Sequence, residues 1–205
     1  MTTFSLASGL IAITLISGCA VKGNVVVTEP VDGLRTRIRV AAPDKGNSFS
    51  APYRGVRAYP GSSCIDKFLP GGGNVVNPTA GFEKTLNDQQ RGMPISAYSQ
   101  DKHFRVAEFY AVANQPISLS YFRAGSQSST YDASGGRITT YHNDHCVRSV
   151  QFIPHADADY EFIFDALGSC KVQVYQLETK DGQVLPTSMD IQPAPDCEVL
   201  PPTED

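Results

Sequence analysis

Short runs of alternating apolar and polar residues, each ended by a turn, do most to limit the folds open to this chain. The clearest run covers residues 34 to 40 and has two sides: Leu34, Thr36, Ile38 and Val40 on one, Arg35, Arg37 and Arg39 on the other. Alternation with period two is typical of a half-buried β-strand. We therefore predict that the arginine side is a solvated sheet face. The alternative is that the three arginines bind an anion.

Further strand-like segments follow, separated by Gly, Pro, Asn and Asp residues that favour turns. They cover residues 53–59, 105–113, 116–122, 147–153, 160–164 and 171–177, and residues 25–27 could add an edge strand. Roughly six or seven short strands with few helices predict an all-β protein, an antiparallel β-sandwich of immunoglobulin- or transthyretin-like architecture. The expected core is formed by large apolar residues: Ile38, Val40, Phe109, Leu119, Phe152, Phe162, Phe164 and Val174.

Two connections have a different pattern. Asn77-Pro78 can cap a short helix that has Phe82 and Leu86 on one face and ends before Gly92-Met93-Pro94. Residues 125 to 136 are rich in Ser and Gly without periodicity, so we expect a long exposed loop there.

The segment before Cys19 bears on where the protein goes. Residues 6 to 16 are uncharged and mostly apolar, and Ile16-Ser17-Gly18-Cys19 ends them. A run of this length suits the core of a secretory signal and is too short for a spanning helix, which needs about 20 residues. Ile16-Ser17-Gly18-Cys19 resembles the lipobox of bacterial lipoproteins, which implies cleavage before Cys19 and lipidation of that cysteine. No Lys or Arg precedes the run, so a soluble secreted protein and an uncleaved anchor stay open.

The lipobox resemblance, the strand pattern and the Pro-rich C-terminal residues together divide the chain into four expected parts. Residues 1–18 form a signal helix that is cleaved, residues 19–33 a lipid anchor and tether, residues 34–180 the sandwich, and residues 181–205 a Pro-rich tail. In Gram-negative lipoproteins an Asp after the lipidated Cys retains the protein at the inner membrane. Ala20 occupies that position, so the resemblance implies a palmitate-bearing protein of the outer membrane that faces the periplasm.

Parts of the body also resemble other proteins of the bacterial envelope. The segments Arg37-Ile38-Arg39-Val40, Tyr59-Pro60-Gly61-Ser62-Ser63-Cys64 and Gly92-Met93-Pro94 are similar to segments of small Gram-negative lipoproteins. The run from Phe152 to Phe162 resembles a strand, corner and strand element of envelope sandwiches. These resemblances imply a location and a fold, and they imply no activity.

The chain has five cysteines: Cys19, Cys64, Cys146, Cys170 and Cys197. If Cys19 carries lipid, an even number remains, and export implies that they form two disulfides. Counting leaves three pairings open. Topology favours Cys146 with Cys170, because both begin strands that run in the same direction, provided that the later strand crosses to the facing sheet or the loop ends curl together. Cys64 then pairs with Cys197 by elimination and pins the tail.

The densest group of candidate metal ligands is His142-Asn143-Asp144-His145-Cys146, to which His155, Asp157 or Asp159 could add a fourth. A disulfide at Cys146 removes the sulfur ligand, so we expect no metal and no cofactor, with His142 and His145 as the candidates if zinc does bind. Asp157 and Asp159 lack the surrounding oxygen ligands of a calcium loop and fit a polar corner between strands.

Other chemistry has no recognisable motif. Ser62-Ser63-Cys64 does not fit the Gly-x-Ser-x-Gly elbow of hydrolases, and Gly71-Gly72-Gly73 lacks the Lys of a phosphate loop. The formal net charge is −4 and no basic cluster is present, which argues against nucleic acid. We therefore expect a non-catalytic, membrane-anchored envelope lipoprotein that binds a protein partner or serves as a structural module. The alternatives are an accessory lipoprotein of a secretion or surface-assembly machine, and a metal-dependent or hydrolytic enzyme.

Overall fold

The computed structural model describes residues 25–44, 54–66, 69–76, 84–142, 145–165 and 169–198. Nearly all regular structure in this part of the chain is β, with one short 3-10 helix, η1, at Tyr98–Gln100. The strands are β1 Arg35–Pro43, β2 Arg54–Pro60, β3 Gly73–Val76, β4 Phe104–Val112, β5 Ile117–Arg123, β6 Ser126–Tyr131, β7 Arg137–His142, β8 Cys146–Phe152, β9 Asp159–Phe164, β10 Val172–Lys180, β11 Gln183–Ser188 and β12 Gln192–Pro193.

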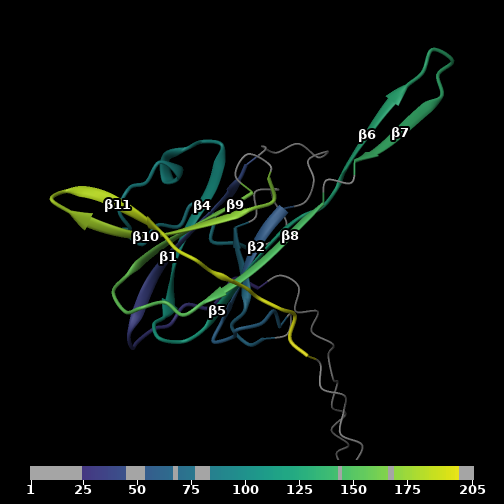
Figure 1. The fold of residues 1–205 in the computed structure, drawn as a ribbon. Helices are drawn as coiled ribbons and strands as arrows, with labels where there is room; N and C mark the ends of the chain where they lie inside the picture. Colours follow the sequence, from purple (N-terminus) through teal and green to yellow (C-terminus); the bar gives the residue numbers. More distant parts are fainter. Residues whose placement is uncertain are drawn as a thin grey trace, which may run out of the picture.

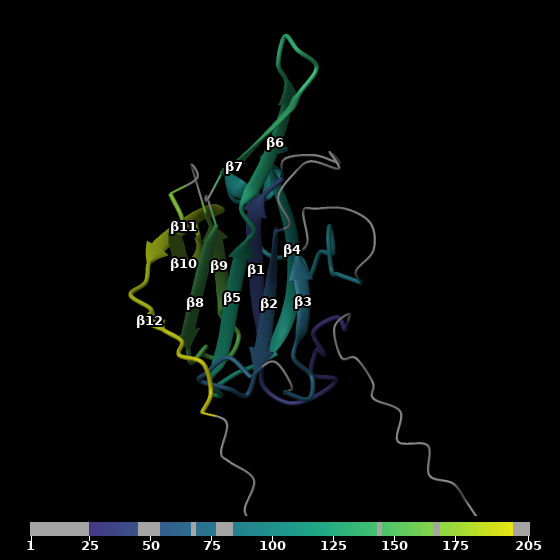
Figure 2. The same ribbon diagram turned by 90° about the vertical axis from the view of Figure 1, so that its right-hand side faces the viewer.

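The strands form two five-stranded sheets and one separate hairpin, β6–β7 (Figures 1 and 2). The first sheet has the order β12-β8-β5-β2-β3, and the second sheet has the order β11-β10-β9-β1-β4. The paired strands of both sheets run antiparallel except β1 and β9, which are parallel. The predicted sandwich is therefore confirmed, with one parallel pair inside the second sheet.

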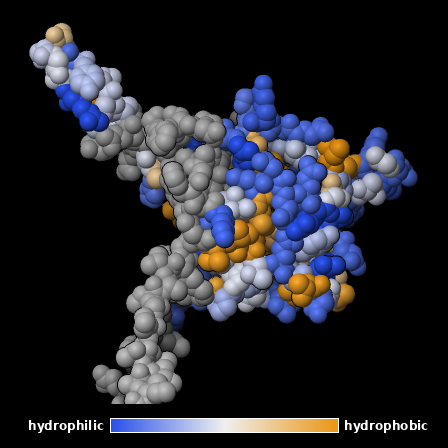
Figure 3. Space-filling view, turned by 180° about the vertical axis from the view of Figure 1, so that it is seen from behind, coloured by the Kyte–Doolittle hydropathy of each residue, from blue (hydrophilic) through white to orange (hydrophobic). Residues whose placement is uncertain are grey.

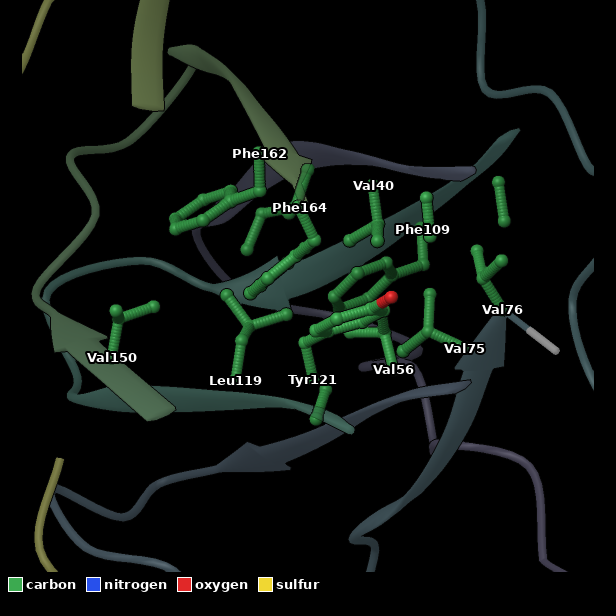
Figure 4. Close-up of a cluster of buried hydrophobic side chains, with 14 of the residues drawn as sticks. Val40, Val56, Val75, Val76, Phe109, Leu119, Tyr121, Val150, Phe162 and Phe164 are labelled. Carbon is green, nitrogen blue, oxygen red and sulfur yellow. The ribbon is translucent and has the colours of Figure 1, made fainter. Parts of the chain in front are cut away.

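The core lies between the sheets (Figure 4), and it contains all the predicted core residues except Phe152. Phe109, Phe162 and Phe164 from the second sheet meet Leu119 and Tyr121 from the first (Figure 4). Phe152 is half-buried at the margin, where its ring packs 5.0 Å from the rings of Tyr160 and Phe162, measured between centroids. Burial of such large apolar side chains is the main source of stability in a fold of this kind.

Both disulfides join the predicted pairs. Cys146 and Cys170 have Cα atoms 5.7 Å apart and connect the start of β8 in the first sheet to the residues before β10 in the second. β10 lies in the sheet that faces β8, as one of the two expected arrangements requires, but the chain crosses one strand earlier than expected, between β8 and β9. Cys64 and Cys197 have Cα atoms 5.1 Å apart. The two bridges are consistent with an oxidising compartment outside the cytoplasm.

The C-terminal residues add more to the sheets than a pinned tail would. β11 pairs with β10 along its whole length, and β12 pairs with β8 at two residues. Beyond them, the Ile65 backbone bonds to the chain on either side of Asp196, through Pro195 and Cys197. The sheets therefore continue past residue 180 to the second disulfide.

The predicted helix after residue 77 is wrong where it can be assessed. Residues 77–83, with Phe82, lie outside the described residues, and residues 84–92 contain no helix. Instead, Leu86 N donates to Val75 O at the edge of β3, and Asp88 N donates to Val106 O at the edge of β4. Backbone groups that bond to sheet edges are not available for helical bonds, so tertiary pairing overrides the local pattern.

The Ser- and Gly-rich segment predicted as a loop, residues 125–136, forms β6 and the turn of a β-hairpin whose second strand is β7. β6 pairs with β7 in regular antiparallel register, from Ser126 opposite His142 to Tyr131 opposite Arg137. The hairpin projects from the body as an arm (Figures 1 and 2), and it is mostly hydrophilic or neutral (Figure 3). Its exposure agrees with the prediction. Its strands were missed because Ser and Thr on both faces give no apolar alternation.

The turn of this arm is organised by Asp132. Its Oδ1 accepts hydrogen bonds from Ser134 Oγ at 2.6 Å and from the backbone N–H of Gly136 at 2.7 Å. These bonds favour the charged form and hold the pKa of the Asp132 carboxyl below its usual value, the Ser134 hydroxyl contributing most. The turn is therefore best supported with Asp132 ionised.

The residues expected as a tether pack on the body from residue 25 onward. Val26 bridges Asn74 of β3 in parallel, so the possible edge strand is a single bridge, and the Val27 side chain is buried. A Cβ at Gly73 would lie 2.4 Å from Val25 O, so only glycine permits this close approach.

Candidate functional site

A row of polar residues crosses the outer face of the second sheet, the face turned away from the core. The register places Arg39 of β1 beside Glu108 of β4 on one side and beside Glu161 of β9 on the other. The row continues through Tyr175 of β10. Because side chains at paired positions share a face, these side chains are neighbours on one surface although they are far apart in sequence.

Arg39 is the centre of this row and is 1 % exposed. Its Nη2 and Nε donate to Glu108 Oε1 at 2.6 and 3.0 Å, and its Nη1 donates to Glu161 Oε1 at 3.1 Å. Glu108 and Glu161 are also buried. A buried ion pair is tolerated only where the remaining donors and acceptors are satisfied, and Arg39 meets this by a further bond to Pro94 O at 2.7 Å.

Residues 89–97, the cover segment, lie over this row and explain its burial. Besides Pro94, the segment supplies the backbone N–H groups of Arg91 and Met93, which donate to Glu108 Oε2. Gly92 O accepts a bond from Arg37, whose guanidinium forms a two-point ion pair with Asp159 at 2.6 and 2.8 Å. The cover segment is thus fixed to the sheet through charged side chains.

The predicted solvated arginine face is correct only in part. Arg35 is exposed and lies 4.6 Å from the centroid of the Tyr110 ring, and Arg37 is half-buried. Arg39 is buried, because the cover segment closes over the middle of β1. The anion-binding alternative finds no support at Arg37 and Arg39, since carboxylates of this chain already pair with both.

A cavity of about 300 Å³ lies where the cover segment meets the β10–β11 hairpin. Its walls come from the cover segment and η1, from β9 and from the hairpin: Ile95, Ser96, Ala97, Tyr98, Glu161, Tyr175, Leu177, Val184 and Pro186. Most of these side chains are apolar or aromatic, and Glu161 is the only formally charged residue among them at neutral pH. Pockets that bind small molecules combine such walls with a few placed polar groups.

Glu161 has one engaged and one available carboxylate oxygen. Oε1 accepts bonds from Arg39 and from Ser96 Oγ. Within the described residues no hydrogen bond reaches Oε2, and the side chain is only 3 % exposed. By contrast, Glu108 accepts bonds at both oxygens. Glu161, a buried carboxylate that lines the cavity, therefore has one oxygen without a hydrogen bond from the described residues.

A second buried polar cluster lies beside the Cys146–Cys170 disulfide. Asp165 accepts bonds from Tyr121 OH at 3.0 Å and from the backbone N–H of Cys170 at 2.7 Å, and it pairs with Arg123. Burial raises the pKa of the Tyr121 phenol well above its usual value, and the neighbouring carboxylate of Asp165 raises it further. This cluster holds the chain before β10 to β5.

The candidate metal ligands that the structure describes do not come together. Cys146 is in a disulfide, His145 is exposed, and the side chain of His142 lies outside what the structure describes. Asp159 is occupied by Arg37, while His155 and Asp157 are exposed. Among the described residues no group of three or more His, Cys, Asp or Glu could hold a metal ion.

The remaining sequence candidates have structural roles or fall outside the described residues. Ser62 Oγ donates to Cys64 O at 2.7 Å and so supports the turn before the disulfide. Cys19 lies outside the described residues. In the ranges that the structure covers, no helix is both long enough and apolar enough to cross a membrane. Comparisons with protein families, with curated proteins and with solved structures found no match.

Sequence reasoning missed Glu108 and Glu161 entirely. One signal was present: each interrupts an apolar or aromatic strand, as in Tyr160-Glu161-Phe162, at a position opposite to the core face. A charge at that position is ordinary for a solvated sheet face. Only the cover segment makes these positions buried, and its course cannot be read from local pattern.

Proposed function

We propose that this chain is a lipoprotein of the bacterial cell envelope, lipidated at Cys19, held at the outer membrane facing the periplasm, and non-catalytic. Its role is to bind another envelope protein. The proposal joins the lipobox of residues 16 to 19 to a disulfide-bonded β-sandwich.

The pairing of the cysteines carries this proposal. The two disulfides use four of the five cysteines, so no cysteine of the chain is left to pair with Cys19. In an exported protein an unpaired cysteine needs a separate explanation, such as an intermolecular bond or a reactive thiol. Its position at the end of the lipobox supports lipidation as that explanation.

The geometry of the body supports a contact role for the β6–β7 arm. Val25, which lies within the expected anchor and tether, packs beside Gly73 at the start of β3. The arm leaves from Arg123 and Cys146, at the opposite end of the first sheet (Figure 2). With lipid at Cys19, the chain from Cys19 to Val25 spans at most about 22 Å, so the body lies close to the membrane and the arm points away from it.

The anchor is tested by replacing Cys19 with serine. We expect the wild-type chain to float with outer membranes and to carry a diacylglyceryl group on Cys19, because stable anchoring needs about two acyl chains. The Cys19→Ser variant should be soluble or uncleaved. Mass spectrometry of the membrane-bound protein measures this, and unmodified Cys19 in that fraction would refute the anchor without bearing on the fold.

The binding role is tested with a photo-crosslinking residue at Ile138 of the arm, which is 51 % exposed. We expect crosslinking in intact cells to give a discrete adduct with another envelope protein. Ile153 is the matched control, since it is similarly exposed at 59 % but lies at the corner between β8 and β9. Equal adducts from both positions, or none from Ile138, would contradict the role of the arm. An adduct with a second copy of this chain would identify self-association instead.

A further inference from the structure

We infer that the cavity beside Glu161 binds an alkylammonium group, as carried by a free aliphatic amine or by a lysine side chain. The cavity lies in the body, on a different part of the molecule from the arm. The inference goes beyond the proposed function and does not depend on the lipid anchor.

The charge of the buried row favours a cation. Arg39 is one guanidinium between two carboxylates, and its shorter and more numerous bonds go to Glu108. The nearby cations are already paired: Arg37 with Asp159 and Arg91 with Glu29. Glu161 therefore has the weakest compensation in the row, and a carboxylate buried to this degree gains most from a further cationic partner.

The available acceptor fits an ammonium donor. Oε2 of Glu161 has no hydrogen bond from the described residues, while Oε1 is held by Arg39 and Ser96. An ammonium group has three donors, of which one can bond Oε2 and another the Ser96 hydroxyl, which is also at the wall. The Ser96 oxygen already accepts from Ser99 N, and its second lone pair is left for the ligand. An anionic ligand would instead face the carboxylate at close range and be repelled.

The walls fit the alkyl part of such a ligand. Leu177, Val184 and Pro186 come from paired positions of β10 and β11 on the same face as Glu161, and Ile95 lies opposite on the cover segment. Tyr98 and Tyr175 add aromatic rings, which attract ammonium groups through their faces. The volume of about 300 Å³ suits a short aliphatic chain and is small for a drug-sized molecule.

The edge of the cavity also carries exposed apolar surface. Ile95 is 64 % exposed although it lies next to the buried row. An alkyl chain that enters beside Ile95 would remove part of this surface from water, which is favourable.

The test is a titration of the purified full chain, with both disulfides formed, followed by NMR. The probes are n-butylamine and its neutral counterpart 1-butanol. We expect saturable shifts of the amides of residues 95–98 and 184 with butylamine, and at least about tenfold weaker binding of butanol, since a charge-assisted hydrogen bond is lost. Equal binding of the two probes, or no saturable shift with butylamine, would overturn the inference.

Variants locate the contact. Glu161→Gln keeps the shape of the side chain and should weaken butylamine at least about tenfold. Glu108→Gln is the matched control, since it also removes a carboxylate partner of Arg39, but Glu108 does not line the cavity. The affinity of this variant for butylamine should stay within about threefold of the wild-type value. An equal loss in both variants would mean that the charge of the row acts at a distance and that Oε2 is not the contact.

A second pair of variants covers the case in which Glu161→Gln does not fold. Val184→Trp fills the cavity from the edge hairpin and should abolish the shifts, whereas Leu185→Trp, on the other face of β11, should not. Unchanged binding in Val184→Trp would overturn the site.

A third probe, Nα-acetyl-lysine methylamide, distinguishes a lysine side chain from a free amine as the source of the ammonium group. Tighter binding of this probe than of butylamine identifies a lysine side chain, and the reverse order identifies a free amine.

Discussion

Replacing Arg39 with alanine is expected to lower the free energy of unfolding by about 3–5 kcal/mol. The side chains of Arg39, Glu108 and Glu161 are only 2, 6 and 3 % exposed. Removing the guanidinium leaves two carboxylates close together, away from water, with no opposite charge between them. Denaturant unfolding of the full chain, followed by circular dichroism, measures the loss.

Two comparisons isolate the cause. Arg35→Ala removes an arginine from the same strand and the same face, but Arg35 is exposed, so the expected loss is within about 0.5 kcal/mol. The triple variant Arg39→Met, Glu108→Gln, Glu161→Gln removes the charges together and should recover much of the stability, because the main penalty is an uncompensated buried charge. A loss below about 1 kcal/mol for Arg39→Ala, or no recovery in the triple variant, would contradict this account. It would show that water screens Glu108 and Glu161, so that they are not uncompensated buried charges.

Much of the sandwich could be predicted because most of its central strands have their own local signal. Residues 34–40 and 171–177 alternate with period two, and the phenylalanines of β9 lie on its inward side. Turn residues separate these segments, so the positions of these strands along the chain follow from pattern, whereas their order in the sheets does not. The pairing of Cys146 with Cys170 followed from strand direction, and the crossing that it requires is present.

The rest depends on contacts that no local pattern contains. The β6–β7 arm has Ser and Thr on both faces, and the pairing of its two strands is what defines it. The parallel register of β1 and β9 brings together Arg39 and Glu161, which are separated by 122 residues. The candidate cavity depends on the same register and on the cover segment, so neither its position nor its one available carboxylate oxygen was accessible from sequence.

Replacing Cys64 and Cys197 together with alanine is expected to cost more stability than replacing Cys146 and Cys170. The Cys64–Cys197 bridge closes a loop with a sequence separation of 133, whereas the Cys146–Cys170 bridge closes a loop with a sequence separation of 24. In the chain-entropy description of a crosslink these loops correspond to about 5 and about 3.5 kcal/mol.

The larger value applies only if the native C-terminal segment stays docked without its bridge. Three sets of contacts favour this: β11 on β10, β12 on β8, and the backbone bonds between Ile65 and the residues around Asp196. Denaturant unfolding of both double variants gives the two losses, and hydrogen exchange at Ala194 N and Cys197 N reports whether the segment detaches. If the segment detaches, the native state gains conformational entropy as the unfolded state does. The loss in the free energy of unfolding is then smaller. A smaller loss for the Cys64–Cys197 pair than for the Cys146–Cys170 pair, with Ala194 still protected, would contradict the entropic account of this bridge.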